Sequence, residues 1–464
     1  MDVTEKELER RRFILEGNEW KVIFAISMPV VIYNTMSQLF QFVDTLIAAG
    51  ISTKVVSIVS FISSISWTMQ TLGTGLAVGG GIIVARHFGS GDMEMVRKRI
   101  SSILFITLFV SVAMTCIFVP FAKPFLTLLR MPPELIEDAC TYFIIEVAGI
   151  VFLFINMIYY SIEKACGNTK AYMWCNLLFS ILKTSFNIIF VYVLNGGLTA
   201  LPGATLLAQV IISGIAFSRL FSRKNPFRLS LKYCSFEKPF VSKLASLSVP
   251  VFMEKFIFAF GKVIVNSMCA FYGSSVIGAL GVSNRIGGLS TQPPGGFEEG
   301  ETTLISQNLG NGNLKRALNI FYKVFFINMV FALVCFIITG IFQQPLVLIF
   351  AKGDSAFAEA IAKIYYYERL DTILIAINTS VMGLLYGFGK TTIALYLNIL
   401  RLFVYRIPPL FLFIHYTNLG IEAVGIAMLV SNGMVGLTSG VVAIPLLAKI
   451  KRQHEKYEKK GGGF

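Results

Sequence analysis

Apolar stretches long enough to cross a lipid bilayer recur along this chain and constrain its fold more than any other feature. Each covers roughly 20 to 30 residues, and a helix of about 20 residues crosses the hydrocarbon core. Charged residues make up only 14% of the 464 residues. Backbone polar groups in lipid must be satisfied internally, so the stretches predict an all-α polytopic membrane protein. Twelve transmembrane helices are expected, near 21–48, 55–85, 100–128, 134–161, 168–194, 199–221, 242–271, 275–306, 316–342, 357–387, 391–416 and 420–448.

Basic residues gather in alternate loops, which orients the expected spans. One set of segments holds the charged first tail, residues 97–99, the segment 222–241 and the tail beyond residue 449. The opposite set offers little beyond Lys54, Lys123, Arg130 and Lys352. Because Lys and Arg mark cytoplasmic loops, both termini are expected in the cytoplasm of a chain embedded in the cell (plasma or inner) membrane. This placement explains the net charge of +14 without a nucleic-acid partner.

Residue patterns typical of an enzyme or a metal centre do not occur. Membrane-embedded transferases generally hold Mg²⁺ with clustered aspartates, and the aspartates here, at positions 2, 44, 92, 138, 354 and 371, are isolated. The seven cysteines lack the spacing of a disulfide framework or a zinc site. No enzyme activity and no cofactor are therefore expected.

The second half of the chain is a diverged copy of the first. HFGSGD at 87–92 returns as NLGNGN at 308–313, and Pro29 returns as Pro250, an offset of 221 (250 − 29). Two halves of six spans enter the membrane in the same direction, which predicts two six-helix lobes related by a pseudo-two-fold axis along the membrane normal. The expected organisation is a cytoplasmic N-tail 1–20, an N-lobe 21–221, a cytoplasmic linker 222–241, a C-lobe 242–448 and a C-tail 449–464.

The repeated polar turns are expected to be structural rather than gating elements. Their glycines permit a positive φ in a tight turn. Asp92 and Asn313 stand where a side chain caps the next helix.

A polar stripe runs along the first expected span. At about 100° per residue, one side of that helix presents Asn34, Ser37, Gln38, Gln41, Asp44 and Thr45. A charge facing lipid is costly, so the stripe is expected to face a wet cavity; a packing or interfacial carboxylate at Asp44 is the alternative. Pro29 interrupts the hydrogen-bond ladder and, like its counterpart Pro250, predicts either a hinge or a fixed bend.

Further carboxylates lie at membrane depth in the second half. Glu254 beside Lys255 indicates either a gate or a simple ion pair. Pro293–Pro294 predicts a helix break followed by a cavity wall that attracts organic cations, formed by Glu298, Glu299 and Glu301; the alternative is a solvated helix end. Asp371 is expected in a charge cluster with Glu368 and Arg369. The basic residues at this depth, expected to neutralise carboxylates or reach the interface, are Lys183, Lys262, Arg285, Arg401 and Arg406.

The paired turns ARHFGSGD and SQNLGNGN, the stretch PVVIYNTMSQLFQFVDT and the segment GNTK resemble the multidrug and toxic compound extrusion (MATE) transporters, in the prokaryotic DinF-like branch. The resemblance covers almost the whole chain. It implies two lobes around a central cavity that holds the polar residues above, and export of mostly cationic organic compounds in exchange for H⁺ or Na⁺.

The resemblance also implies a cation-coupling group. Asp44, fifteen residues after Pro29 (44 − 29), matches the aspartate of the family's first helix, and Asn187 matches the asparagine of its fifth. Gln41 precedes Asp44 on the same stripe. The pattern then fails, because Val191 and Ala208 stand where an aspartate and a threonine are expected. A proton needs fewer ligands than Na⁺, so H⁺ is favoured.

A polyspecific antiporter that acts as a monomer on small organic substrates, surrounded by membrane lipid, is therefore expected. Two rival functions are a flippase for lipid-linked sugars, which would favour a basic cavity, and a membrane-embedded transferase.

Overall fold

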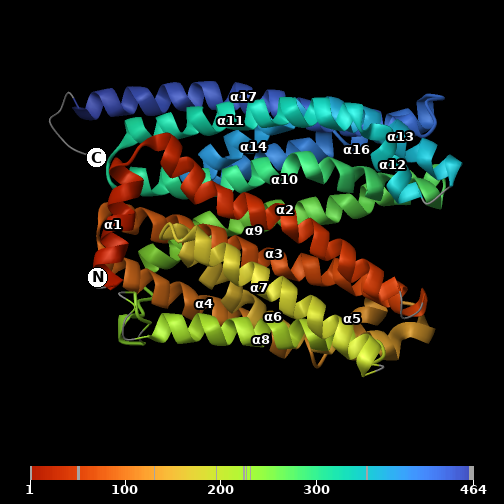
Figure 1. Cartoon of the computed structure of the whole chain (residues 1–464), viewed down its shortest axis with the longest axis horizontal. Coiled ribbons are helices and arrows are strands. Elements are labelled where there is room, and N and C mark those ends of the chain that lie inside the picture. Colours follow the sequence, from red (N-terminus) through yellow and green to blue (C-terminus); the bar gives the residue numbers. More distant parts are fainter. Residues whose placement is uncertain are drawn as a thin grey trace. The chain divides into compact units, whose positions relative to one another are not determined.

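The computed structural model describes residues 3–49, 53–129, 131–194, 196–222, 225, 227–229, 231–351 and 354–458. Within these ranges the chain is helical and contains no strand (Figure 1). Nine of the described helices are long and apolar enough to cross a membrane, and α13 with α14 forms a tenth candidate bent by 54°. The remaining two expected spans correspond to α9 and α10, in which charged residues interrupt the apolar sequence.

The chain divides into two compact units, and two helices are each shared between them. Unit 1 comprises Met1–Gly17 and Met36–Phe252, and unit 2 comprises Asn18–Thr35 and Met253–Phe464. The shared helices are α2 (Glu19–Ala49) and α9 (Lys238–Cys269). The other helices of unit 1 are α1 (Val3–Glu16), α3 (Thr53–Ser90), α4 (Met93–Phe118), α5 (Ala122–Leu128), η1 (Pro133–Leu135), α6 (Ile136–Ala165), α7 (Thr169–Ile188), η2 (Ile189–Val193), α8 (Ala200–Phe221) and η3 (Leu231–Tyr233). Those of unit 2 are η4 (Ala270–Tyr272), α10 (Ser274–Gly310), α11 (Leu314–Ile341), α12 (Gln343–Ala351), α13 (Ser355–Leu370), α14 (Thr372–Gly387), α15 (Thr391–Ile399), η5 (Leu400–Val404), α16 (Ile407–Tyr416) and α17 (Glu422–Glu458).

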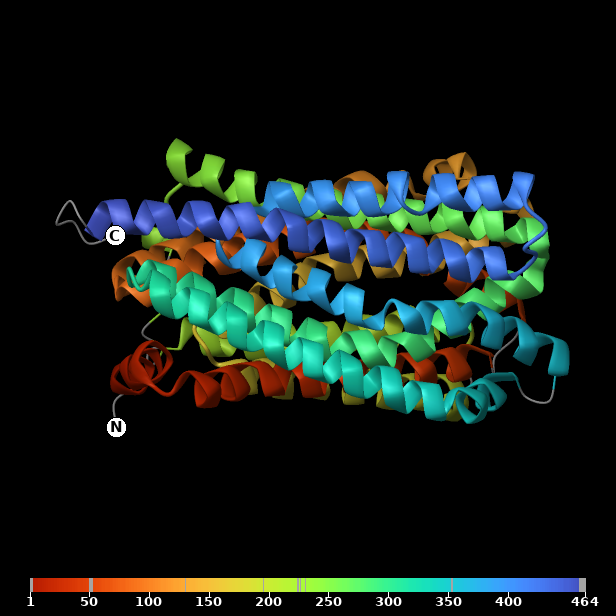
Figure 2. The ribbon, with the colours of Figure 1, turned by 90° about the horizontal axis from the view of Figure 1, so that it is seen from above.

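The same helix pairings recur in both units. In unit 1, α6 packs against α3, α4 and α8. In unit 2, α14 packs against the counterparts α10, α11 and α17, and Figure 2 shows α17 running beside α14. Each unit has its own apolar core; Phe143 and Phe154 are fully buried in the first, and Ile361 and Ile364 in the second. The repetition seen in the sequence is thus a repetition of packing.

Small residues bring the first half of α9 close to α3, and the first half of α2 close to α10. In unit 1, a Cβ on Gly75 would lie 2.7 Å from the carbonyl oxygen of Ser248. In unit 2, a Cβ on Gly296 would lie 2.7 Å from the backbone nitrogen of Val31. Gly75 and Gly296 are counterparts in the repeat (296 − 75 = 221). The first helix of each repeat therefore packs its first half within one unit and continues in the other.

The repeated polar turns cap helices, as their sequence predicts. Asp92 Oδ1 accepts a hydrogen bond from the backbone N–H of Met95 at 2.9 Å, and Asn313 Oδ1 accepts one from Arg316 at 3.0 Å. Gly91 and Gly312 adopt φ values of 83° and 74°, which favour glycine because a Cβ is strained there. The cap predictions are confirmed.

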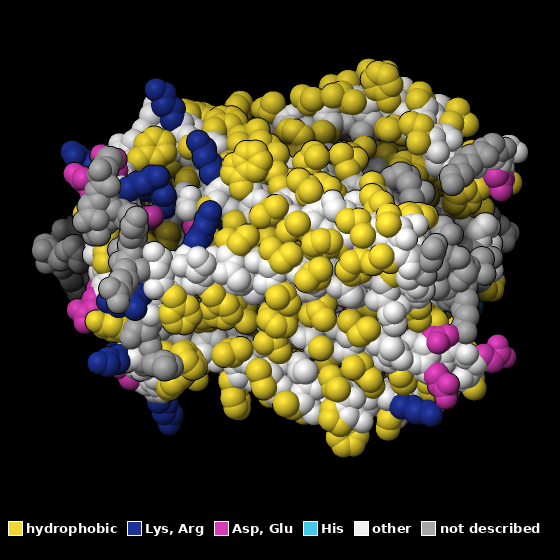
Figure 3. All heavy atoms as spheres, turned by 60° about the horizontal axis from the view of Figure 1, so that its bottom comes forward, with side chains coloured by type: hydrophobic (Ala, Val, Ile, Leu, Met, Phe, Trp, Pro, Cys, Tyr) yellow, Lys and Arg dark blue, Asp and Glu magenta, His cyan; other side chains and the backbone are white. Residues whose placement is uncertain are grey.

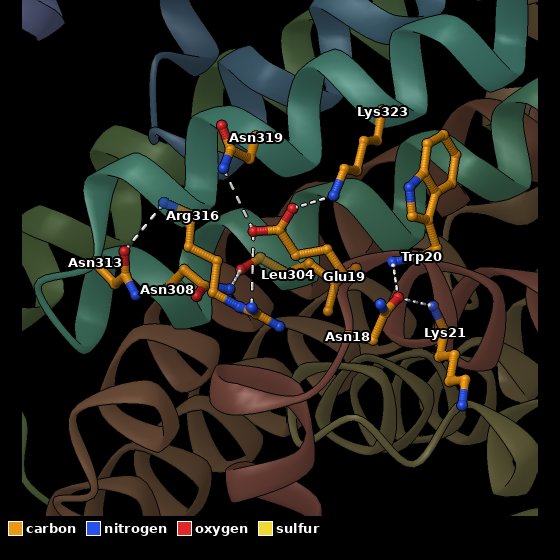
Figure 4. Close-up of polar contacts among 10 residues, drawn as sticks. All are labelled: Asn18, Glu19, Trp20, Lys21, Leu304, Asn308, Asn313, Arg316, Asn319 and Lys323. Atoms are coloured by element: carbon orange, nitrogen blue, oxygen red, sulfur yellow. Dashed lines mark hydrogen bonds and ion pairs between the residues drawn. The ribbon is translucent and has the colours of Figure 1, made fainter.

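The start of α2 is tied to α11 within unit 2, as Figure 4 shows. Asn18 caps α2 by accepting hydrogen bonds from the backbone N–H groups of Trp20 and Lys21. The Glu19 carboxylate pairs with Lys323 and lies 3.7 Å from Arg316. These bonds hold the first half of α2 on unit 2.

The expected helix break at Pro293–Pro294 is wrong, because α10 runs without interruption from Ser274 to Gly310 with both prolines inside it. Each proline removes one backbone N–H donor from the helix. The residues of the neighbouring turns keep their N–H groups. Contacts of α10 with α11, α13 and α14 support the helix on several sides. Packing therefore maintains a helix that the local sequence would interrupt.

Large apolar side chains are exposed along the helices. Phe109, Leu128 and Ile444 are 75%, 78% and 69% exposed. On the face drawn in Figure 3, hydrophobic side chains cover the middle and charged ones gather toward the helix ends. Exposed apolar surface of this extent marks a lipid-facing protein.

Candidate functional site

Asp44 is held by two side chains from one face of α7, all within unit 1. Lys183 Nζ donates to Asp44 Oδ2 at 2.7 Å, and Asn187 Nδ2 donates to Oδ1 at 3.0 Å. Lys183 and Asn187 face the same way because residues four apart lie one helical turn apart. The structure thus brings Asp44 and Asn187 together and adds a lysine ammonium to them.

The Asp44–Lys183 pair is half-buried and formally neutral. The Asp44 and Lys183 side chains are 23% and 29% exposed, whereas Asn187 is 2% exposed. Asn187 Oδ1 is buried and accepts no hydrogen bond from any described residue. Val191, in the π-helix η2, and Ala208, in α8, are both buried. Their apolar side chains offer no oxygen ligand for a metal cation.

The rest of the polar stripe on α2 is divided between the two units. Asn34 belongs to unit 2, and its Nδ2 donates to Glu299 Oε1 of α10 at 3.3 Å. Gln38 and Gln41 belong to unit 1; Gln38 is half-buried and Gln41 is exposed. The side chain of Thr45 lies outside the described residues.

Glu254 on α9 forms the ion pair that its neighbour in sequence suggests. Lys255 Nζ lies 2.9 Å from Glu254 Oε1. The Tyr386 hydroxyl of α14 donates to Glu254 Oε2 at 2.6 Å. Glu254 is only 3% exposed, so both oxygens of a buried carboxyl group are satisfied within unit 2.

Glu301 on α10 is fully buried inside unit 2. It is 0% exposed, and neither carboxyl oxygen has a hydrogen-bond partner among the described residues. Its carboxyl group lies against Gly383 of α14, where an added Cβ would be 2.5 Å from Glu301 Oε2. Glu298 and Glu299, nearby on α10, are half-buried. The three glutamates are therefore not a solvated helix end.

Asp371 lies at the bend between α13 and α14 and is 4% exposed. Asn432 Nδ2 of α17 donates to Asp371 Oδ2 at 2.9 Å. The expected cluster with Arg369 does not form, because the Arg369 guanidinium stacks 5.1 Å from the centroid of Phe336. The bend turns the two side chains toward different neighbours.

One feature that sequence reasoning missed is a pairing of a half-buried glutamate with a serine in both units. Glu146 of α6 accepts a hydrogen bond from Ser66 of α3, and Glu368 of α13 accepts one from Ser283 of α10. The repeat matches the two glutamates at an offset of 222 (368 − 146). That match could have singled out the two glutamates from the sequence alone. Their serine partners could not be found in the same way, because these contacts depend on how the helices pack.

Comparison with known proteins points to one family. The sequence profile of the MatE family matches residues 29–189 and 250–412. A probable multidrug resistance protein NorM from Thermotoga maritima is 21% identical over 414 residues, 88% of this chain and 89% of that protein. A probable multidrug resistance protein YpnP from Bacillus subtilis is 24% identical over 425 residues, 89% of this chain and 92% of that protein.

A solved structure shares the fold. The crystal structure of a MATE protein in complex with MaL6 superposes with a TM-score of 0.91 at 20% identity, covering 95% of this chain and 99% of that one. MATE structures have twelve helices in two lobes, in agreement with the twelve helical spans described above.

Proposed function

The chain belongs to the MatE family of multi-pass membrane transporters and is not an enzyme; from that premise we propose that it is a secondary antiporter that exports organic compounds in exchange for H⁺. Its halves alternate between inward- and outward-facing arrangements. It acts as a monomer in the cell membrane, with both termini in the cytoplasm. Its partners are small organic molecules and lipid, without a nucleic acid, and the coupling ion is its only cofactor.

The contact between Lys183 and Asp44 is the observation that carries proton coupling. The lysine ammonium, 2.7 Å from Asp44 Oδ2, stands where a metal cation would bind that oxygen. Na⁺ would have to displace a tethered cation, and Val191 and Ala208 supply no replacement ligands. A proton needs only one carboxylate oxygen, so the geometry favours H⁺ over Na⁺.

Protonation of Asp44 would also supply a conformational signal. It removes the negative charge that is hydrogen-bonded to Lys183 and leaves Glu146 as the carboxylate that still acts on this ammonium; a less well paired ammonium at membrane depth is costly. The pair joins the second half of α2 to α7, so its loss removes one of the contacts that hold α2 within unit 1, where Ile47 also packs in the apolar core. A proton that binds one arrangement more tightly than the other shifts the population between them.

Two prolines lie where such a movement would be absorbed. Pro29 and Pro250 are inside α2 and α9, shortly before each helix passes from one unit to the other, after Thr35 and after Phe252. A helix with a missing hydrogen bond bends more readily there. We assign the hinge role to these two positions.

The carboxylates of unit 2 are suited to attract cationic parts of a substrate. Substrate contact within unit 2 is assigned to Glu254, Glu298, Glu299 and Asp371, together with Asn34 of α2. Gln38, further along α2, is assigned to substrate contact within unit 1. Glu301 joins the residues of unit 2 only when α10 and α14 separate, because Gly383 covers its carboxyl group.

Transport of ethidium by proteoliposomes tests the proposal. An imposed proton gradient is expected to drive saturable movement, and a sodium gradient is not. Asp44→Asn should abolish proton-driven movement while the protein stays folded, and Asp138→Asn, at an exposed position at the start of α6, should not. Wild-type rates in Asp44→Asn would refute the assignment.

A flippase for lipid-linked sugars remains a second candidate because Arg401 and Arg406 are gathered inside unit 2. A diphosphate head group would find two guanidinium partners there. Translocation of a lipid-linked sugar in the same vesicles, without ethidium movement, would select this function.

A further inference from the structure

Three basic side chains surround one aromatic ring in unit 2. The guanidinium carbons of Arg401 and Arg406 lie 5.2 and 6.0 Å from the centroid of the Phe258 ring. Lys262 Nζ lies 5.3 Å from the same centroid. Phe258 and Lys262 stand one turn apart on α9, and the arginines belong to η5 and the start of α16. Lys262, Arg401 and Arg406 are called the basic cluster below.

Neutral side chains, not carboxylates, accept the hydrogen bonds of the two arginines. Asn432 Oδ1 accepts from Arg401 Nε at 3.1 Å and Nη2 at 2.7 Å, and from Arg406 Nη2 at 2.7 Å. Arg406 Nε donates to Ser431 Oγ at 3.1 Å. Among the described residues, neither arginine has a carboxylate oxygen within the 4.0 Å of an ion pair. One amide oxygen thus serves two guanidinium groups.

Two carboxylates that act electrostatically on the arginines already have other partners. Glu368 accepts a hydrogen bond from Ser283, and Asp371 accepts one from Asn432. Both interact electrostatically with Arg406 across a longer distance.

The third carboxylate that acts on the arginines, Glu254, is already neutralised by Lys255 on the same helix. Arg401 and Arg406 therefore face negative charge only beyond ion-pair distance, and their direct hydrogen bonds go to neutral side chains.

We propose that the basic cluster binds an oxyanion, a phosphate or carboxylate group carried by the transported molecule. Arginine presents a planar fork of donors that matches the two oxygens of such groups. Arg406 is 5% exposed and Arg401 is half-buried, so water competes weakly, whereas Lys262 is exposed and leaves one side accessible. The bound oxyanion replaces the shared amide oxygen of Asn432.

This inference rests on the proposed transport function and narrows its substrates. The half-buried carboxyl group of Glu298 suits a positive part of the molecule, and the basic cluster suits a negative one. The exported compounds then include amphoteric or anionic molecules beside organic cations such as ethidium.

Equilibrium binding of inorganic pyrophosphate to the purified chain in detergent tests the site, by calorimetry and by the shift in unfolding temperature. Ionic strength is held constant with chloride, so that general screening does not mimic binding. The wild-type protein is expected to bind saturably. Arg401→Gln and Arg406→Gln should each weaken the affinity about tenfold or more, the effect of losing one charge-assisted hydrogen bond.

Two further variants keep the result interpretable. Lys262→Gln changes an exposed side chain of the cluster and should weaken binding without harming folding. Arg369→Gln removes an arginine of the same unit that stacks on Phe336, outside the cluster, and should leave the affinity unchanged. No saturable binding by the wild type, or equal affinity in all four variants, would overturn the proposal.

The source of the oxyanion is decided by repeating the measurement in nanodiscs. Competition by phosphatidylglycerol, but not by phosphatidylcholine, assigns the site to a lipid head group. If the pyrophosphate affinity is the same in nanodiscs of either lipid, the site is assigned to a soluble substrate. Because binding needs no gradient, a failure of proton-driven ethidium transport with intact pyrophosphate binding would refute the antiport proposal and leave this site standing.

Discussion

Replacing Lys183 by methionine removes the ammonium that pairs with Asp44 and keeps an unbranched side chain of similar length. An exposed ion pair contributes about 0–1 kcal/mol, and breaking a buried one costs about 3–5 kcal/mol. Asp44 and Lys183 are 23% and 29% exposed, between these limits. We therefore expect the coupling between the two side chains to be about 2 kcal/mol, or about 30-fold in an equilibrium constant.

A double-mutant cycle measures this coupling from the free energy of unfolding in mixed detergents. It compares the wild type with Lys183→Met, Asp44→Asn and the double variant. The double variant should lose less than the sum of the single losses, by the coupling energy. Lys170→Met, at an exposed lysine on the same helix, serves as the control and should show no coupling with Asp44→Asn. Additivity of the Lys183 and Asp44 variants within about 0.5 kcal/mol would refute the reasoning.

The same variant has a consequence for ion selectivity. Lys183→Met vacates the position beside Asp44 Oδ2, although Val191 and Ala208 still supply no oxygen ligand, so a sodium gradient is expected to drive only weak ethidium movement in this variant and none in the wild type. Sodium-driven movement by the wild-type protein would contradict the idea that the lysine excludes Na⁺.

Two further predictions concern stability, measured as the free energy of unfolding in mixed detergents. Asp92→Ala and Asn313→Ala should each destabilise the protein by about 1 kcal/mol, because each removes a helix cap; an unchanged free energy would contradict the cap assignment. Gly296→Ala should destabilise it by about 1–3 kcal/mol, since its Cβ would lie 2.7 Å from a backbone nitrogen of α2. Gly281→Ala on the same helix has nothing within 4 Å and should be neutral or stabilising; equal losses at the two glycines would contradict the packing argument.

The helices and their caps could be predicted from the sequence because these signals are local. Apolar runs mark spans, and Asp92 or Asn313 bonds an N–H group three residues away. The repeat could also be found, since matched residues at an offset of 221 or 222 need no knowledge of the structure. The break at Pro293–Pro294 was mispredicted because neighbouring helices support α10 across two prolines.

The side-chain partners at the candidate site could not be predicted from local sequence signals. Lys183 could be recognised as a cation at membrane depth, and its spacing from Asn187 places both on one face of α7. Whether this face contacts Asp44 depends on how α2 and α7 are rotated about their own axes. Lys183 and Asp44 lie 139 positions apart (183 − 44), so local sequence signals do not determine that rotation. The same holds for Asn432, whose amide oxygen accepts hydrogen bonds from Arg401 and Arg406.

The sequence by itself determined the helical spans, their duplication and the polar turns that cap the helices after them. Bilayer thickness and backbone hydrogen bonding, which set these features, act within one segment of the chain. Three features depend on the tertiary structure. Helices α2 and α9 each contribute to both units, Lys183 pairs with the carboxylate of Asp44, and the basic cluster surrounds the ring of Phe258. These features arise where helices distant in sequence pack together, and small side chains such as Gly75 and Gly296 set how closely the backbones approach.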